Sequence, residues 1–184
     1  MFNYYYDKLS PAGKSVFDSL KIGLQNFDKE IKITPSAKSQ DIQDAVYAIK
    51  KDVPTFFHVD YAFNYSLAPF ASVTPTYLYH KEEYEDMLSS LEYEKAAIIK
   101  AIPGFNQKSE LHKAIALHNL MTKHIVYDYE QLEYEYPEGN PLSYTAFGAL
   151  VRKKAVCAGF ALAYKYLCDS SGVCLLYTSP SPRD

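Results

Sequence analysis

The chain has 184 residues, of which 48% are hydrophobic and 22% are charged, a composition typical of a globular protein with a buried core. Its 19 Lys and Arg residues against 22 Asp and Glu residues give a net charge of -3, which argues against a nucleic-acid partner. No apolar run reaches the roughly 18–20 residues of a membrane span. Three cysteines are too few for a dense disulfide framework.

The first hundred residues predict a mostly helical region with one β-hairpin. Ser10 and Pro11 form a favourable helix start, because proline suits the first helical position. The expected elements are a helix over 11–27, a short edge strand over 30–35, a helix over 38–51, a hairpin over 55–79 and a helix over 82–101.

The hairpin is predicted from alternation. Over residues 55–66 the odd positions from Phe57 to Tyr65 are all apolar or aromatic, which indicates a half-buried strand. Residues 73–79 are the expected partner strand, and Pro75 restricts that partner to an edge or bulged position.

The second half of the chain predicts helices around a loop. Ser109 caps a helix that runs to about His124, and its wide apolar arc predicts a central position in the fold. Residues 128–142 read as a loop, Ser143 is expected to cap a short helix, and a last helix begins at about Cys157. Pro103 and Gly104 mark a soft boundary, which gives an accessory region over 1–105 and a second region over 106–173.

Cys157 is the first candidate for chemistry, because it stands at the predicted start of an amphipathic helix. Unpaired backbone N–H groups and the positive end of the helix dipole favour a thiolate there, and the basic turn 152–154 would add to this effect. Ala158 and Gly159 are small, so a substrate backbone could approach and the free amides could receive an oxyanion. The alternative is a small hydrophobic core residue, the more common role of a single cysteine on an apolar helix face.

The residues around Cys157 also form a longer pattern. Residues 144–161 read YTAFGALVRKKAVCAGFA, the helix closes over 166–173 as YLCDSSGV, and IVYD precedes the loop at 125–128. This pattern resembles the nucleophile segment of the transglutaminase-like superfamily, whose bacterial members show a short helix ending in Leu-Val, a basic or glycine turn, and a Val-Cys-x-Gly-aromatic-Ala helix start. The resemblance covers residues 109–173.

The resemblance implies an α+β protein: the mostly helical accessory region with its hairpin, followed by the N-terminal helical half of a papain-like domain that lacks its β-sheet. Cys157 would be the catalytic nucleophile, acting on protein or peptide amides through a thioester, with hydrolysis, transamidation or deamidation as the outcome. The family's His and Asp come from strands after this helix. All five histidines precede Cys157, so the chain is expected to be inactive as given.

The alternative function is a non-catalytic peptide-binding or scaffold domain in which Cys157 is a buried structural cysteine. Another papain-like hydrolase is a further alternative, which only a substrate assay separates from a transglutaminase-like enzyme.

No metal or cofactor site is predicted. His112, His118 and His124 are six residues apart, and each step turns by about 240° on a helix, so the rings point in three directions. All five histidines are interpreted as surface or boundary residues. Cys168 is expected in the core, since it lies about 16 Å along the helix from Cys157, too far for a disulfide.

The loop over 127–136 interleaves tyrosines with acidic residues. It could form a cleft wall above Cys157 that binds a basic or extended peptide, but a solvated acidic loop is the favoured interpretation.

The two ends of the chain carry separate expectations. Residues 174–184, CLLYTSPSPRD, resemble a translated sequencing adapter, which predicts a non-native tail and a natural protein that continues past Val173; the alternative is a genuine Ser/Pro-rich tail. The first residues lack the features of a signal peptide. A cytoplasmic location follows if Met1 is the true start, whereas the full-length parent could be exported.

Overall fold

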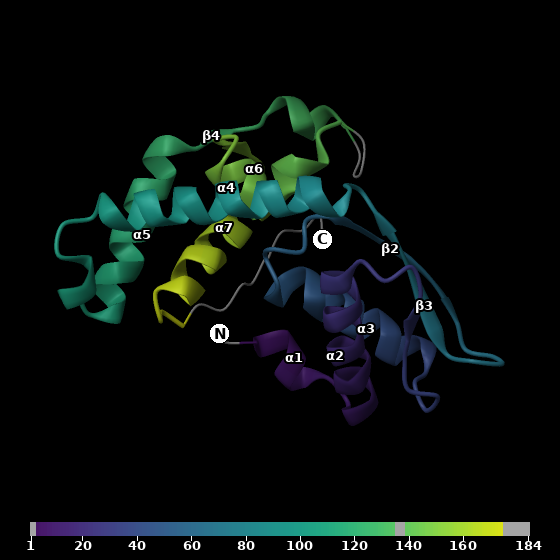
Figure 1. Cartoon of the computed structure of the whole chain (residues 1–184). Coiled ribbons are helices and arrows are strands. Elements are labelled where there is room, and N and C mark those ends of the chain that lie inside the picture. The colour runs from purple at the N-terminus through teal and green to yellow at the C-terminus, as the bar shows by residue number, and fades with distance from the viewer. Residues whose placement is uncertain (1–2, 135–138, 175–184) are drawn as a thin grey trace. The chain divides into compact units, whose positions relative to one another are not determined.

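The computed structural model describes residues 3–134 and 139–174, and these fall into two units that divide between Tyr84 and Glu85. The division lies near the start of helix α4 (Lys81–Lys100), whereas the boundary expected from the sequence lies just after the end of that helix. Helices predominate in both units and each contains a small sheet (Figure 1). The mixed α+β class predicted from the sequence is therefore confirmed.

The first unit packs helices against a three-stranded antiparallel sheet. Its elements before α4 are α1 (Tyr4–Lys8), α2 (Pro11–Asn26), β1 (Ile31–Lys32), α3 (Ser39–Asp52), β2 (Val59–Ser66) and β3 (Ser72–Tyr77). Helix α2 begins where the sequence predicts, because the Ser10 hydroxyl accepts a 2.9 Å hydrogen bond from the Gly13 N–H. Apolar residues of α2 and α3 join the sheet in one buried cluster, which includes Leu20, Ile49 and Val73.

The hairpin accommodates Pro75 in the way the sequence suggests. The strand order is β1-β3-β2, so β3 is the central strand where β1 pairs with Ser72 and Val73. Pro75 lies beyond that pairing. On the β2 side the register shifts between Asp60 and Asn64, opposite Pro75, and this irregularity fits a residue without an N–H group.

The second unit builds most of its structure from helices and tight turns. After α4 its elements are η1 (Phe105–Gln107), α5 (Glu110–His124), β4 (Val126–Tyr127), η2 (Glu130–Glu133), η3 (Pro141–Tyr144), α6 (Ala146–Leu150), β5 (Lys154–Ala155) and α7 (Cys157–Ser170). Strands β4 and β5 form a parallel pair in which Val126 lies opposite Lys154. The sequence predicted no strand in this region, so this pair corrects that expectation.

Helix α5 does not have the central position that its apolar residues predicted. Leu117 and Met121 are its buried residues, whereas Leu111 is 67% exposed and Ile115 is 48% exposed. The helix packs on α7 along a narrow face, where the Tyr164 hydroxyl donates a 3.0 Å hydrogen bond to the Ala114 carbonyl. Within the described residues, no helix is long and apolar enough to cross a membrane.

Candidate functional site

Cys157 lies at the start of a helix, as the sequence predicted. It is the first residue of α7 and its side chain is exposed. The preceding residue, Val156, has extended backbone angles and supplies no side-chain cap. The N–H groups of the first turn are thus left without a side-chain acceptor at the cap position, and the thiol sits at the positive end of a 14-residue helix.

Gly159 allows the start of α7 to approach the preceding turn. A β-carbon on Gly159 would lie 2.4 Å from the Ser143 carbonyl oxygen and 2.9 Å from the β-carbon of Ala155. The Val156 N–H donates a 3.0 Å hydrogen bond to the same Ser143 oxygen. The sequence interpretation that Gly159 leaves room for a substrate is therefore wrong: protein backbone fills that space.

A buried carboxylate holds this turn in place. The Ser143 hydroxyl donates a 2.6 Å hydrogen bond to Oδ2 of Asp128, and Oδ1 accepts from the Gln131 N–H at 3.3 Å and pairs with Lys154 at 3.2 Å. Burial alone would raise the pKa of Asp128, but the hydrogen bonds from Ser143, Lys154 and Gln131 outweigh it and hold that pKa below its ordinary value. The Asp128 backbone N–H in turn donates to the Ala155 carbonyl at 2.9 Å.

This network refines one sequence prediction and corrects another. The acidic loop was expected to be solvated, and Glu130 and Glu133 are exposed, but Asp128 is buried, with 3% exposure. Ser143 was expected to cap the short helix, but Thr145 caps α6 by accepting from the Gly148 N–H at 3.1 Å. Spacing could not reveal the link between Asp128 and Ser143, because the two residues are 15 positions apart.

The two lysines of the basic turn before Cys157 are paired with carboxylates. Lys153 forms a 2.6 Å ion pair with Glu94 and also donates to the Leu150 carbonyl, while Lys154 pairs with Glu130 at 2.6 Å as well as with Asp128. Lys153 adopts a left-handed backbone with a φ of 58°, which is unusual for a residue with a β-carbon. Lys153 and Lys154 are thus committed to structural ion pairs.

The histidines do not gather around Cys157. His80, His112, His118 and His124 are exposed, as the sequence predicted, and the described residues include no hydrogen bond between a histidine and Cys157. The described part of the chain also contains no group of three or more His, Cys, Asp or Glu side chains that could hold a metal ion.

His58 is the exception among the histidines, since it is fully buried in the first unit. Its Nε2 lies 3.1 Å from the Leu24 carbonyl oxygen, so this nitrogen carries the proton, and its Nδ1 is buried with no hydrogen-bond partner among the described residues. Burial lowers the pKa of His58 to about 4. The burial of His58 was not predicted, because the alternation of the hairpin strand placed this residue on the polar side.

Two further polar residues are buried in α7. Lys165 forms a 2.9 Å ion pair with Asp169, one helical turn away, and both side chains are almost completely buried. Cys168 is also fully buried, as predicted, and burial raises its pKa to about 11. This face of α7 is therefore structural.

The tyrosines of the loop are divided between packing and exposure. Tyr127 stacks on Phe160 of α7 with ring centroids 6.1 Å apart, whereas Tyr129 is 73% exposed and Tyr134 is 51% exposed. Tyr136 lies outside the described residues. The exposed rings of Tyr129 and Tyr134 therefore come shortly after strand β4 in the chain.

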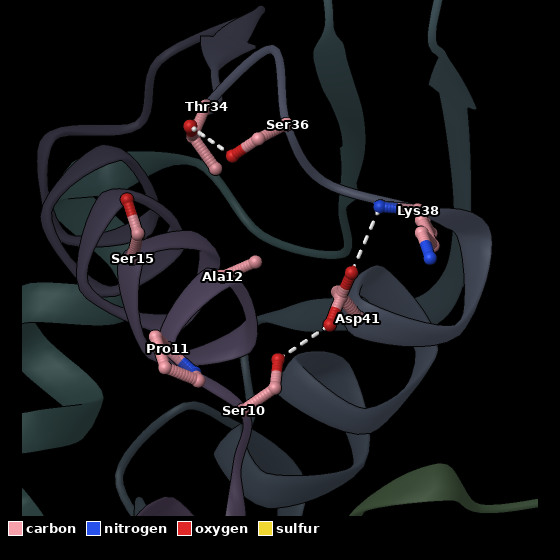
Figure 2. Close-up of a pocket in the computed structure, with 8 residues that line it drawn as sticks. All are labelled: Ser10, Pro11, Ala12, Ser15, Thr34, Ser36, Lys38 and Asp41. Carbon is pink, nitrogen blue, oxygen red and sulfur yellow. Dashed lines mark hydrogen bonds between the residues drawn. The ribbon is translucent and has the colours of Figure 1, made fainter.

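A groove of about 590 Å³ lies in the first unit where α2 and α3 begin. Figure 2 shows Asp41 between Ser10 and Lys38: its carboxylate accepts from the Ser10 hydroxyl at 2.5 Å and from the Lys38 N–H at 2.9 Å. The hydrogen bonds from Ser10 and Lys38 lower the pKa of Asp41. The Asp41 carboxylate thus links the start of α2 to the start of α3, and its role in the groove is structural.

Comparison of the whole chain with models of protein families and with curated proteins finds no match.

Proposed function

We propose that Cys157 is the nucleophile of a transglutaminase-like cysteine enzyme that acts on amide bonds of proteins or peptides. The observation that carries the proposal is the position of Cys157: an exposed thiol on the first residue of a helix whose cap supplies no side-chain acceptor. An anion is stabilised at such a helix start, and a cysteine there can act as a nucleophile.

The proposed chemistry is acyl transfer through a thioester. The Cys157 sulfur attacks the substrate carbonyl carbon, the C–N bond breaks, and the departing amine takes up a proton. Water or a second amine then attacks the thioester, the C–S bond breaks, and the thiolate is restored. N–H groups of the first turn of α7 would stabilise the negative oxygen of each tetrahedral intermediate.

The network around Asp128 supports this role by fixing the start of α7. Asp128 binds the Ser143 hydroxyl, and Ser143 binds the Val156 N–H immediately before Cys157. No histidine among the described residues contacts Cys157, so the proposal assigns no general base within them. The expected activity of this chain is therefore a slow single acylation rather than turnover.

The alternative of a scaffold domain depended on a buried structural cysteine. Cys157 is exposed, so that interpretation of the residue is wrong, and Cys168 is the cysteine that fits it.

The proposal is tested by acylation with a p-nitrophenyl ester of an N-acetylated dipeptide near pH 6.5, followed by peptide mass spectrometry. Cys174 is an exposed thiol outside any helix and serves as the internal reference. We expect the acyl group on Cys157 first, and its loss in Cys157→Ser. Equal acylation of Cys157 and Cys174, or none at Cys157, would contradict the proposal.

A further inference from the structure

Burial along the short helix η2 (Glu130–Glu133) follows the period of a 3-10 helix. In such a helix, side chains three positions apart lie on the same side. Gln131 is 2% exposed, and Asp128, three positions earlier, is 3% exposed, so one side of η2 faces the interior of its unit. The positions between and after these two residues are exposed, and they form the two remaining sides of the helix.

The two exposed sides of η2 differ in their chemistry. One side carries the carboxylates of Glu130 and Glu133, both of which are exposed. The other side carries Tyr129 and Leu132, which are 73% and 47% exposed, and Tyr129 has the helical backbone angles that keep it in phase with Leu132. An apolar side and an acidic side therefore lie next to each other in solvent, and these four residues are called the η2 surface below.

A row of aromatic rings connects the η2 surface with the first turn of α7. The Tyr129 ring centroid lies 5.0 Å from that of Tyr127, and Tyr127 stacks on Phe160. Phe160 is three positions after Cys157, so both residues lie on one side of α7. The η2 surface is thus joined by ring contacts to the side of α7 that carries the exposed thiol.

The η2 surface retains a negative charge after its internal pairing. Glu130 forms the 2.6 Å ion pair with Lys154, three positions before Cys157, which attaches η2 to the turn before α7 and neutralises one carboxylate. Glu133 is exposed and forms no ion pair within the described residues. Its carboxylate lies one position from Leu132, so the charge is adjacent to the apolar side.

We infer that the η2 surface binds an Arg or Lys side chain of the substrate, one or two residues before the carbonyl that Cys157 attacks; this inference rests on the proposed function. A basic side chain packs its alkyl part on apolar surface while its cation stays in water. It can therefore lie along Tyr129 and Leu132 and extend its cation to Glu133, and a cation over the tyrosine ring adds further attraction. Each extended residue spans about 3.3–3.6 Å, so the basic residue is placed before the attacked carbonyl rather than on it.

Charge selects a basic side chain over the other classes. An acidic side chain would bring a second negative charge to Glu133. A purely apolar side chain would cover the apolar side and take water from the Glu133 carboxylate without pairing it, which costs free energy. Only a side chain with both an apolar part and a positive charge fits both sides of the η2 surface.

The inference is tested by acylation of the full chain with the p-nitrophenyl esters of N-acetyl-Arg-Arg-Gly and N-acetyl-Cit-Cit-Gly, since citrulline is the neutral analogue of arginine. The thiolate displaces p-nitrophenolate, and peptide mass spectrometry gives the ratio of acylated Cys157 to acylated Cys174, which cancels the intrinsic reactivity of each ester. This ratio should be about fivefold higher for the arginine ester, because exposed cation–π and ion-pair contacts are each modest. The preference should fall in about 1 M NaCl, which screens exposed charges.

Two pairs of variants assign the preference to the η2 surface. Glu133→Gln should reduce it, whereas Glu30→Gln, the same change at an exposed position of the first unit, should not. Tyr129→Ala should also reduce it, whereas Tyr93→Ala should not, although Tyr93 is likewise 73% exposed.

The outcomes separate this inference from the proposed function. Acylation of Cys157 ahead of Cys174 with equal ratios for the two esters, or with a preference that both Glu133→Gln and Tyr129→Ala retain, would overturn the inference and leave Cys157 as the nucleophile. Equal acylation of Cys157 and Cys174 by both esters would overturn the proposed function and the inference with it.

Discussion

The Ser143 hydroxyl donates a 2.6 Å hydrogen bond to Asp128, and both side chains are buried. Ser143 also accepts from the Val156 N–H through its carbonyl. The buried carboxylate is therefore connected by two hydrogen bonds to the residue that precedes Cys157, so the start of α7 depends on Asp128.

Asp128→Asn should lower the free energy of unfolding at pH 7 by about 1–3 kcal/mol, because a buried hydrogen-bonded carboxylate is lost. The pKa of Asp128 is below its unfolded value, so this contribution is present above about pH 4 and declines as the pH falls through the folded pKa. Urea unfolding of both proteins between pH 3 and pH 7 measures it.

A double-mutant cycle with Ser143→Ala provides the control. If the hydrogen bond between Ser143 and Asp128 stabilises the fold, the double variant Asp128→Asn/Ser143→Ala should lose less unfolding free energy than the sum of the losses in the two single variants. Strict additivity would show that the two side chains do not stabilise each other.

Gly159→Ala should destabilise the fold by about 1–3 kcal/mol, since the new β-carbon would lie 2.4 Å from the Ser143 carbonyl oxygen. Helix propensity alone predicts the opposite sign, a gain of about 1 kcal/mol. The sign of the change in unfolding free energy therefore separates steric crowding from propensity. A stabilised Gly159→Ala protein would show that the turn at Ser143 does not press on α7.

Stability should fall as the pH drops from about 6.5 to 4. The folded-state pKa of His58 is lowered to about 4, so below pH 6.5 the unfolded chain binds a proton that the folded chain does not. The full loss is about 3 kcal/mol. Tyr77 and Tyr84, which lie against His58, stay neutral over this range, because the ordinary pKa of tyrosine is about 10 and burial raises it further in both.

Unfolding followed by circular dichroism from pH 4 to pH 7 measures this effect, with His58→Gln as the control, since glutamine can donate to Leu24 but does not titrate there. The variant should show a shallower pH dependence than the wild type. Identical slopes would mean that His58 does not cause the acid sensitivity.

The sequence predicts local features of this protein well. Ser10 and Ser109 mark the helix starts of α2 and α5, Cys157 begins α7, and the alternation from Phe57 to Tyr65 indicates the hairpin strand. These signals depend on neighbours within a turn or two, where propensity and capping act directly.

Long-range contacts explain what the sequence did not reveal. Asp128 is buried because Ser143 and Lys154, which lie much further along the chain, converge on it. Gly159 serves packing rather than substrate access. The burial of Asp128 and the packing of Gly159 depend on which turns contact each other in the folded chain. The periodicity of the sequence does not predict those contacts.

The most direct test of Cys157 as a nucleophile is competitive alkylation of the folded chain with substoichiometric iodoacetamide at pH 6, with the modified sites identified by mass spectrometry. Cys157 should react faster than Cys174, since its exposed thiol lies on the first residue of α7, and the buried Cys168 should react only after unfolding. Equal or slower labelling of Cys157 relative to Cys174 would contradict the proposed function.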